Sequence, residues 1–440
     1  MGDPEVSGAD AAGELGALST FRQFFALRRD VLVLSLAMFG FSLAFQMTGR
    51  YLPEYLRLLG AGAGIIGLYG SLGNLLGALY PYPGGAISDR IGSRTALTAF
   101  GLLSTVGFGL WLAAPALAGL EVAGVSLPAW AWLFVGAVFA QAWKSLGLGA
   151  TFAVVKQSVP ADRLATGFAS TETFRRVGFL VGPLLAAGLL AATPRFVDGF
   201  QRVLAVALAF GLLATVLQHW RYDASQDTLG KTFGGLGELV ADLRSLPSPL
   251  RPLLVGDTLV RFANGMVYVF FVIVVTDFLA VGYSAFGVEL APAAFFGVLL
   301  GVEMTVALLT MVPVANLARR VGLKPVVGLG FLVYAAFPAL LIGAPADAGV
   351  LVALFAFSGL RFAGLPAHKA LIVGPAESGA GGRVTGAYYL VRNVIVIPSA
   401  ALGGWLYGQD PTLAFGLASA VGLVGTAYFL GFGEEFEAYA

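Results

Sequence analysis

The segment Gly85-Ala86-Ile87-Ser88-Asp89-Arg90-Ile91-Gly92-Ser93-Arg94 is a short charged stretch between two long apolar runs. The runs on either side, 65–83 and 95–117, each approach the roughly 20 residues that a helix needs to cross the hydrocarbon of a bilayer. Charged side chains are costly in hydrocarbon, whereas Gly85 and Gly92 permit a tight turn. We therefore expect this segment to form a turn at the membrane surface between two spanning helices.

The composition of the whole chain is that of a membrane protein. Of its 440 residues, 58% are hydrophobic and 12% are charged, whereas soluble domains are about 45–50% apolar and about 25% charged. A net charge of +1 provides no basic surface for nucleic acid. The chain has no cysteine and only two histidines, His219 and an expected interfacial His368, so we expect no metal site and no cofactor.

Apolar runs long enough to span a membrane occur twelve times, in two groups of six separated by a polar stretch. They fall at 31–52, 65–83, 95–117, 128–153, 166–192 and 199–218, and then at 252–282, 292–315, 325–345, 349–373, 384–407 and 411–432. We predict an all-α membrane protein of twelve transmembrane helices in two six-helix bundles.

The domain organisation follows from these runs. Acidic residues precede any arginine at the N-terminus, which is unlike a secretory signal, and three phenylalanines and three arginines up to Arg29 suit an interfacial helix. We predict a cytosolic tail with this helix (1–30), a first bundle (31–218), a cytoplasmic linker (219–251), a second bundle (252–432) and an acidic cytosolic tail (433–440).

Lysines and arginines near the span ends set the expected orientation. Sixteen of them fall on one side, and only Arg50, Arg57, Arg195 and Arg202 fall on the other. Cytoplasmic loops carry the excess of positive charge. We therefore expect a multi-pass protein of the plasma membrane with both termini in the cytoplasm.

The second half of the chain repeats features of the first. After the eighth run it reads Ala318-Arg319-Arg320-Val321-Gly322-Leu323-Lys324, another short arginine-rich turn with a glycine. Such internal repeats are typical of secondary transporters. The repeat supports two bundles of similar, pseudo-symmetric structure.

The pattern Gly85-x-x-x-Asp89-Arg90-x-Gly92-x-Arg94 resembles the signature loop of the major facilitator superfamily (MFS), and the match extends over nearly the whole chain. The resemblance implies a transporter rather than an enzyme. It would bind a small-molecule substrate, work by alternating access and function as a monomer in the lipid bilayer. It also implies that Asp89 faces the start of the eleventh helix near Thr385 and holds the cytoplasmic gate shut. Alternatively, the loop charges only set the topology.

A second motif, Gly178-x-x-x-Gly182-Pro183-x-x-x-x-Gly188, is similar to one associated with proton-coupled drug exporters of the same family, although Ala187 replaces one of its paired glycines. This resemblance implies an exporter of amphipathic or drug-like compounds. Alternatively, the small residues and the proline simply produce a kinked, closely packed helix. A proton-coupled transporter of organic anions or nutrients is the alternative function, and a transporter-like receptor is a remote one.

Ionisable residues inside the predicted spans are candidates for function because they are costly in a membrane. Glu172 precedes Arg175 and Arg176 by three and four residues, and Asp257 precedes Arg261 by four, so these groups are expected to form ion pairs on one helix face. The spans contain the following ionisable residues: Lys144, Glu172, Arg175, Arg176, Asp257, Arg261, Glu303, Arg361 and Arg392.

Glu303 has no such partner at helical spacing and lies near the middle of its run. We expect Glu303 to bind a proton during coupling, with Asp257 as a further candidate. The alternative is a purely structural, protonated Glu303 bonded to Asn74, at the midpoint of the second run, or to a backbone carbonyl.

The fourth and tenth runs carry cations that would line a central cavity in the MFS fold. Lys144 and Arg361, with Arg392, would bind an anionic substrate through charge-assisted hydrogen bonds. Alternatively, these cations pair with Glu303 and with polar neighbours and only balance charge. The remaining cavity candidates are Gln141, Asn74, Asn264 and Tyr388.

Overall fold

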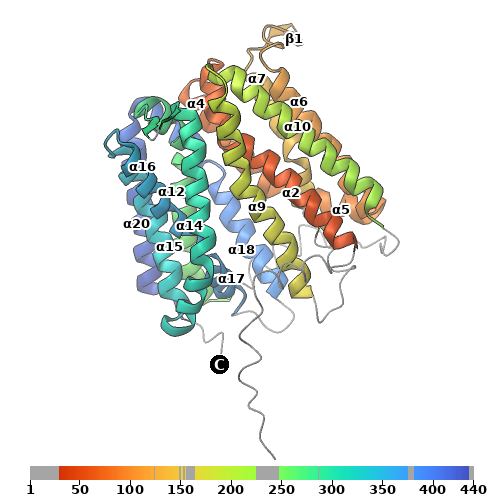
Figure 1. The fold of residues 1–440 in the computed structure, drawn as a ribbon. Helices are drawn as coiled ribbons and strands as arrows, with labels where there is room; N and C mark the ends of the chain where they lie inside the picture. The colour runs from red at the N-terminus through yellow and green to blue at the C-terminus, as the bar shows by residue number, and fades with distance from the viewer. Residues whose placement is uncertain are drawn as a thin grey trace, which may run out of the picture.

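The computed structural model describes residues 29–122, 124–147, 150–151, 154, 164–223, 247–285, 287–374 and 381–435. The expected interfacial helix within 1–30 and most of the linker 219–251 lie outside the described residues, and the C-terminal tail is described only as far as Glu435. Figure 1 shows the described chain as an array of long helices with two short hairpins.

The N-terminal half comprises the helices from α2 to α10. Its elements are α2 (Arg29–Gly49), α3 (Leu52–Leu58), α4 (Ala63–Leu79), α5 (Pro81–Ile91), α6 (Ser93–Ala113), β1 (Glu121–Val122), β2 (Val125–Ser126), α7 (Ala131–Gln141), the π-helix η1 (Ala142–Leu146), α9 (Leu164–Ala191) and α10 (Phe196–Arg221).

The C-terminal half comprises the helices from α12 to α20. Its elements are α12 (Leu250–Val267), the 3₁₀-helix η3 (Tyr268–Phe270), α13 (Phe271–Ile273), the π-helix η4 (Val274–Phe278), β3 (Tyr283–Ala285), β4 (Val288–Leu290), α14 (Pro292–Val321), α15 (Leu323–Ile342), α16 (Ala348–Gly359), the 3₁₀-helix η5 (Leu360–Phe362), α17 (Leu365–Val373), α18 (Gly381–Val396), α19 (Ser399–Gln409) and α20 (Pro411–Phe432).

Ten of the described helices are long and apolar enough to cross a membrane. The bent pair of α4 and α5, which meet at 47° beside Pro81 and Pro83, makes an eleventh. The run predicted at 128–153 contains α7 and η1, which reach only Leu146 before residues that the structure does not describe. Helices therefore occur in all twelve predicted runs, and the prediction of an all-α membrane protein is confirmed.

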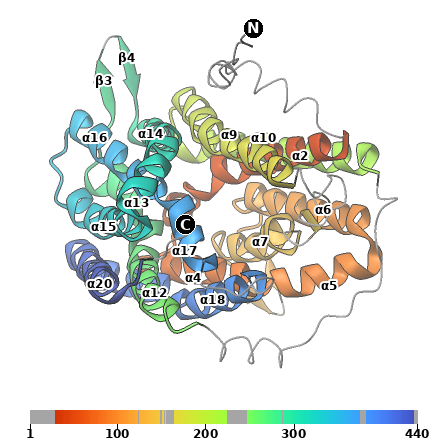
Figure 2. The ribbon, with the colours of Figure 1, turned by 90° about the horizontal axis from the view of Figure 1, so that it is seen from below.

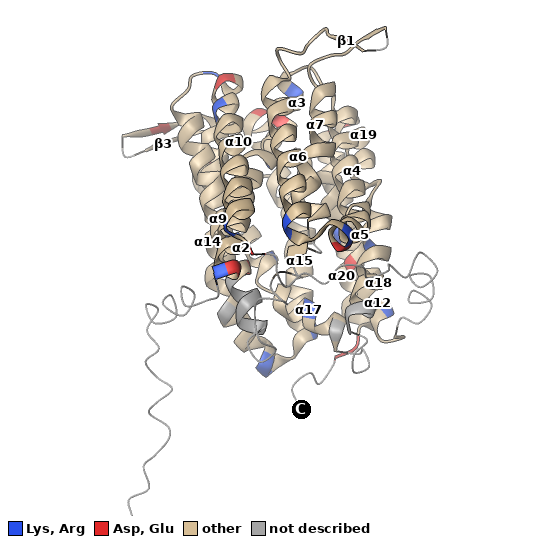
Figure 3. Ribbon diagram, turned by 90° about the vertical axis from the view of Figure 1, so that its right-hand side faces the viewer, with Lys and Arg blue, Asp and Glu red and all other residues tan. Residues whose placement is uncertain are grey.

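The helices pack as two groups, which Figure 2 shows on opposite sides of the molecule. In the N-terminal half α2 packs against α9 and α10, and α6 against α7 and α10; in the C-terminal half α12 and α15 pack against α20, and α14 against α16. Charged residues are sparse along these helices (Figure 3). The two halves contact each other mainly through α4 with α19 and α9 with α14.

Small residues allow the two halves to approach closely at the end of the molecule that carries β1–β2 and β3–β4, which we call the hairpin end. A Cβ atom on Gly404 would lie 2.8 Å from the Cα atom of Gly67, and one on Gly297 would lie 2.6 Å from the carbonyl oxygen of Pro183. Tyr51 also donates a hydrogen bond of 3.2 Å from one half to the carbonyl of Ala293 in the other. The structure is therefore closed between the halves at the hairpin end.

The opposite end carries the turns at Gly92 and Gly322, and we call it the loop end. The two glycines have φ angles of 84° and 94°, a conformation that residues with a Cβ rarely adopt. Each ends one helix and begins the next. The matched turns agree with the internal repeat seen in the sequence.

The segment 85–94 is more helical than we expected. Helix α5 continues to Ile91, so Gly92 alone makes the turn, and the expectation of a turn at Gly85 is wrong. Gly84 rather than Gly85 permits a close approach: a Cβ atom on Gly84 would lie 2.1 Å from the carbonyl oxygen of Leu146, whereas one on Gly85 would meet nothing within 4 Å. A single positive-φ glycine is sufficient to reverse the chain, which leaves Gly85 inside a regular helix.

Candidate functional site

Three cavities formed by described residues lie among the buried charges. The amide cavity, of about 240 Å³, is lined by Arg261, Arg392 and three asparagines, Asn74, Asn264 and Asn393. The junction cavity, of about 180 Å³, is lined by Arg50, Glu172, Arg175, Arg176 and Glu303, among others. The inner cavity, of about 10 Å³, lies beside Arg361, His368 and Gly330.

Glu303 on α14 is held by residues from both halves of the protein. Its Oε1 accepts hydrogen bonds from Arg361 of η5 and, at 2.6 Å, from the hydroxyl of Ser358. Its Oε2 accepts from Arg50 of the N-terminal half at 3.2 Å. Glu303 is only 4% exposed. Glu303 thus has partners far away in the chain although it has none at helical spacing, which agrees with the alternative that cations pair with it. The alternative partner Asn74 is wrong, because Asn74 donates to the carbonyl of Val396.

Arg50 follows α2 and lies inside the protein. The sequence placed it at the outer surface because it ends an apolar run, yet only 10% of its side chain is exposed. Its guanidinium lies over the ring of Tyr268, 4.3 Å from the ring centre, while it pairs with Glu303. The face of the Tyr268 ring and the Glu303 carboxylate together stabilise the Arg50 cation, which would be costly to bury in the membrane without such partners.

Arg361 is the best enclosed cation of the site, with 2% of its surface exposed. Within the described part of the chain its Nε and Nη1 have no hydrogen-bond acceptor, because only Nη2 meets Glu303. Aromatic rings surround the guanidinium, with ring centres at 4.8 Å (Phe362), 5.2 Å (Tyr334), 5.8 Å (Phe337) and 6.0 Å (Phe271). Arg361 therefore pairs with Glu303, as our charge-balance alternative expected, and borders the small inner cavity. Its role in binding a substrate stays a prediction.

Asp257 on α12 is fully buried and is surrounded by groups of the C-terminal half. Arg261 pairs with it at 3.3 Å, as the spacing of four predicts, and Arg392 pairs with it at 3.0 Å. The imidazole of His368 lies 3.2 Å away, so the expectation of an interfacial histidine is wrong. Tyr388, which we expected to line the cavity, is also buried and donates to Asp257 at 3.1 Å.

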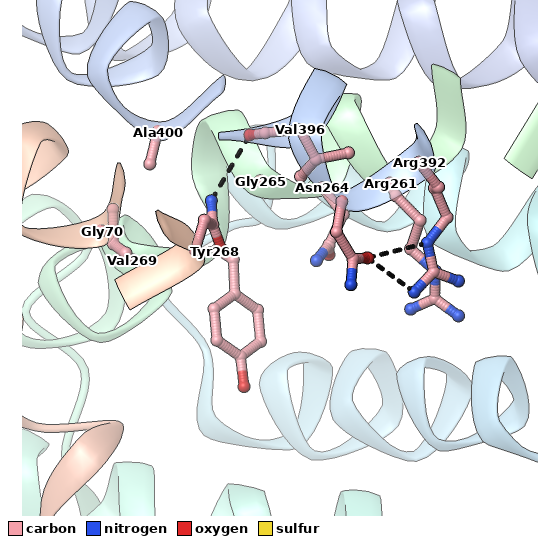
Figure 4. Close-up of a pocket in the computed structure, with 11 residues that line it drawn as sticks. Gly70, Arg261, Asn264, Gly265, Tyr268, Val269, Arg392, Val396 and Ala400 are labelled. Atoms are coloured by element: carbon pink, nitrogen blue, oxygen red, sulfur yellow. Dashed lines mark hydrogen bonds between the residues drawn. The ribbon is translucent and has the colours of Figure 1, made fainter. Parts of the chain in front are cut away.

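The amide cavity lies beside this cluster, between α4 of one half and α12, α18 and α19 of the other (Figure 4). Arg392 donates hydrogen bonds from its Nε and Nη2 to the side-chain oxygen of Asn393, at 3.2 and 3.0 Å. Arg261 donates to the hydroxyl of Tyr334 at 3.0 Å. Among the described residues, none donates a hydrogen bond to the buried Oδ1 of Asn264. The cavity thus brings together the cation Arg392 and the amides Asn74 and Asn264 that the sequence indicated.

Lys144 lies apart from Glu303. It belongs to the π-helix η1, an irregular element that is frequent at functional sites, and its side chain is exposed, 5.7 Å from the ring centre of Phe45. It forms no ion pair within the described part of the chain, so the alternative that Lys144 pairs with Glu303 is wrong. The side-chain oxygen of its neighbour Gln141 is buried and has no partner among the described residues.

Glu172 pairs with Arg175 at 2.7 Å and with Arg176 at 3.0 Å, as the spacing predicts. Arg176 also reaches across to the sulfur of Met311 on α14, at 3.1 Å. This group lines the junction cavity together with Glu303.

The glycines of the motif at 178–188 bring α9 close to α2. A Cβ atom on Gly178 would lie 2.9 Å from that of Ser42, and one on Gly182 would lie 2.9 Å from that of Gln46. Helix α9 continues through Pro183 to Ala191 without a break. The close packing that the sequence offered as an alternative is therefore present.

The loop charges lie at the loop end. Asp89 and Arg90 are in the last turn of α5, and Arg94 is in the first turn of α6 with a buried Nε that has no partner among the described residues. The contact of Asp89 with the region of Thr385 stays a prediction. The sequence did not indicate four residues of the site: Arg50, Ser358, His368 and Asn393. The partners of the first three lie far away in the chain. The partner of Asn393 is the adjacent Arg392.

Comparisons with known proteins agree with this fold. No family model matches the chain. An uncharacterised MFS-type transporter of Methanocaldococcus jannaschii is 21% identical over 407 residues, which cover 90% of this chain and 93% of the relative. An uncharacterised MFS-type transporter of Mycobacterium tuberculosis is 29% identical over 205 residues, covering 46% of this chain and 43% of the relative.

Solved structures of transporters superpose on nearly the whole chain. A POT family transporter in complex with 5-aminolevulinic acid has a TM-score of 0.69 at 14% identity and covers 93% of this chain and 99% of its own. The nucleoside transporter NupG has a TM-score of 0.69 at 12% identity, covering 91% of this chain and 98% of its own. With the apolar helices, these similarities show that the chain has the all-helical membrane fold of MFS-type transporters.

Proposed function

We propose that the protein is a secondary active transporter that moves a small molecule across the membrane by alternating access. In this mechanism two bundles rock about a site near the membrane midplane and expose it to each side in turn. The fold, the cavities between the halves and the transporter relatives support this function. The close packing at the hairpin end is what we expect of one of the two end states of such a cycle.

The single observation that carries the proposal is the position of Glu303 between the halves. Arg361 and Ser358 hold the carboxylate within the C-terminal half, while Arg50 reaches it from the N-terminal half. If the halves separate at the hairpin end, Arg50 must leave Glu303. The buried carboxylate then loses one of its two cations, and its environment changes with the state of the transporter.

Proton coupling at Glu303 follows from the same geometry. A buried carboxylate that loses a cationic partner gains stability by binding a proton. In the structure Glu303 is paired with two arginines, one from each half. Opening of the hairpin end would therefore favour proton uptake, and closure would favour release. The flux of protons is thereby coupled to the movement of the halves.

The orientation follows from the charge asymmetry of the loops. If the loop end, with its arginine-rich turns, faces the cytoplasm of a cell bounded by the plasma membrane, the structure is closed toward the outside. Export of amphipathic or drug-like compounds rests on the motif at 178–188, whose glycines pack α9 against α2.

A second candidate, the transport of an organic anion, is favoured by the charges around the cavities. In the described residues, six arginines line the cavities (Arg50, Arg175, Arg176, Arg261, Arg361 and Arg392), whereas only three carboxylates line them or pair with these arginines (Glu172, Asp257 and Glu303). Such an excess suits an anionic ligand better than a cationic drug.

Reconstitution in liposomes tests the proposed function. We expect a radiolabelled panel of dipeptides, nucleosides, dicarboxylates and lipophilic cations to include a compound that accumulates when a pH gradient is imposed. Protein-free liposomes and liposomes with the Glu303→Gln variant are the controls. Movement of every compound at the rate of protein-free liposomes, in both gradient directions, would contradict transport.

A further inference from the structure

The amide cavity is bordered by an excess of positive charge within one half of the protein. Arg261 and Arg392 both line the cavity and both pair with the same carboxylate, Asp257. Of the described residues that line the cavity, none is acidic. Asp257 therefore compensates one guanidinium, and the second remains without a carboxylate at a depth where charges are costly.

Hydrogen-bonding groups at the cavity wall also lack partners. Arg261 uses its Nε for Asp257 and its Nη1 for Tyr334, and among the described residues none accepts from its Nη2. The buried Oδ1 of Asn264 is likewise without a donor in the described chain. The buried Oδ1 of Asn264 costs free energy without a partner, so a ligand that donates a hydrogen bond to it would bind favourably.

Both halves contribute to this cavity, although unequally. Gly70 and Asn74 of α4 form one wall, and α12, α18 and α19 form the others. Asn74 and Val396 connect the two sides through a hydrogen bond of 3.4 Å. A ligand held by the arginines would thus lie against the contact surface between the halves, where rocking changes access.

We propose that the amide cavity binds the oxyanion of a small molecule, a carboxylate or a phosphate, between Arg261 and Arg392. The guanidinium groups supply charge-assisted hydrogen bonds, which are stronger than neutral ones, and the oxyanion neutralises the unpaired cation. Asn264 accepts from an N–H or O–H group of the same ligand. The cavity volume of about 240 Å³ accommodates a small compound. The assignment of this oxyanion to the transported substrate rests on the proposed transport function.

Binding of succinate to the full chain in nanodiscs tests the site independently of transport. Calorimetry at constant ionic strength should detect succinate in phosphatidylcholine nanodiscs, and should detect at least tenfold weaker binding of succinamide, which has the same shape without charge. Inorganic phosphate forms a second arm. A third arm uses phosphatidylglycerol: if this lipid blocks the site and succinate cannot displace it, the oxyanion belongs to a lipid headgroup, and its role in transport is overturned.

Two variants assign the binding to this cavity. Arg392→Gln leaves Asp257 with Arg261 and His368, so the fold should persist while succinate affinity falls at least tenfold. Asn264→Asp places a negative charge at the wall and should also reduce the affinity at least tenfold. The control Arg202→Gln removes an arginine of α10 whose only described hydrogen bond is to Thr193.

The outcomes separate the site from the proposed function. If Arg392→Gln and the control Arg202→Gln lose succinate affinity equally, the loss is a general effect of charge, and the proposed binding site is wrong. Transport of a compound by a protein that binds neither succinate nor phosphate overturns the anion site alone. Anion binding without any transport leaves the site intact and contradicts the function.

Discussion

Asp257 and Glu303 are both buried carboxylates held by two arginines, but their partners come from different parts of the molecule. The partners of Asp257 all belong to the C-terminal half, from α12, α17 and α18. Glu303 is shared between Arg361 of the same half and Arg50 of the other. In the proposed cycle a cluster within one half would move as a unit and keep its geometry, whereas a bond between the halves would break if they separated.

This difference indicates separate roles for the two clusters. The Asp257 cluster is suited to keep Arg261 and Arg392 in fixed positions at the amide cavity. The Glu303 cluster is suited to respond to the state of the transporter. The following variants compare contacts within a half with contacts between halves.

The largest effect is expected from Asp257→Ala. The substitution leaves two arginines without their carboxylate in a fully buried position, so the free energy of unfolding should fall by about 3–5 kcal/mol. Thermal unfolding in detergent measures the change. The control Asp277→Ala removes a carboxylate that is 53% exposed and should have little effect. Equal stability of the two variants would mean that the Asp257 cluster does not hold the C-terminal half together.

Glu303→Gln should impair function more than stability. The amide retains the shape of the side chain and can bond to Ser358 and Arg361, but it cannot release a proton. Gradient-driven accumulation should therefore fall to background while exchange of substrate across the membrane continues. Glu172→Gln changes a carboxylate whose two described ion pairs are both with residues of α9, and it is the matched comparison. Full accumulation by Glu303→Gln would refute coupling at this residue.

Gly404→Val tests the contact between the halves at the hairpin end. Its Cβ would lie 2.6 Å from the carbonyl oxygen of Ala63 on α4, so the closed hairpin end should be strained and the opposite state favoured. A spin-label distance across this end should lengthen. A Cβ on Gly408 would lie 3.6 Å from that of Ala63, an ordinary contact, so Gly408→Val is the control. Unchanged distances in both variants would show that this packing does not set the state.

The smallest effect is expected from Glu435→Ala, which removes a contact within one half. Glu435 accepts hydrogen bonds from the backbone N–H groups of Leu323 and Lys324, at 2.7 and 2.8 Å, and so caps α15. Its loss should lower stability by about 1 kcal/mol, as for other helix caps. The midpoint of thermal unfolding measures this change. The neighbouring Glu434→Ala should have a smaller effect, and the reverse order would exclude the cap.

The sequence predicts the helices better than it predicts the partners of the buried charges. Hydropathy locates all twelve helical regions, and a spacing of four identifies the pair of Asp257 and Arg261, because both signals are local. Glu303 bonds to residues 55, 58 and 253 positions away, and no local sequence pattern indicates such contacts.

The errors in the sequence-based predictions have related causes. His368 and Arg50 were placed at membrane surfaces because they lie near the ends of apolar runs, whereas buried carboxylates hold them inside. The close approach at Gly84 lies just outside the signature pattern, which begins at the adjacent Gly85. Local sequence therefore gives only approximately how deep a charged residue lies in the membrane, because its final position also depends on ion pairs with residues far away in the chain.

Distances between spin labels test most directly whether the Arg50–Glu303 bond reports the state of the transporter. The chain has no cysteine, so labels can be attached to Gly62→Cys with Gln409→Cys at the hairpin end, and to Ile91→Cys with Val321→Cys at the loop end. Acidification should lengthen the first distance and shorten the second, and Glu303→Gln should produce the same change at neutral pH. If neither acidification nor Glu303→Gln changes the two distances in opposite directions, Glu303 does not couple protons to the movement of the halves.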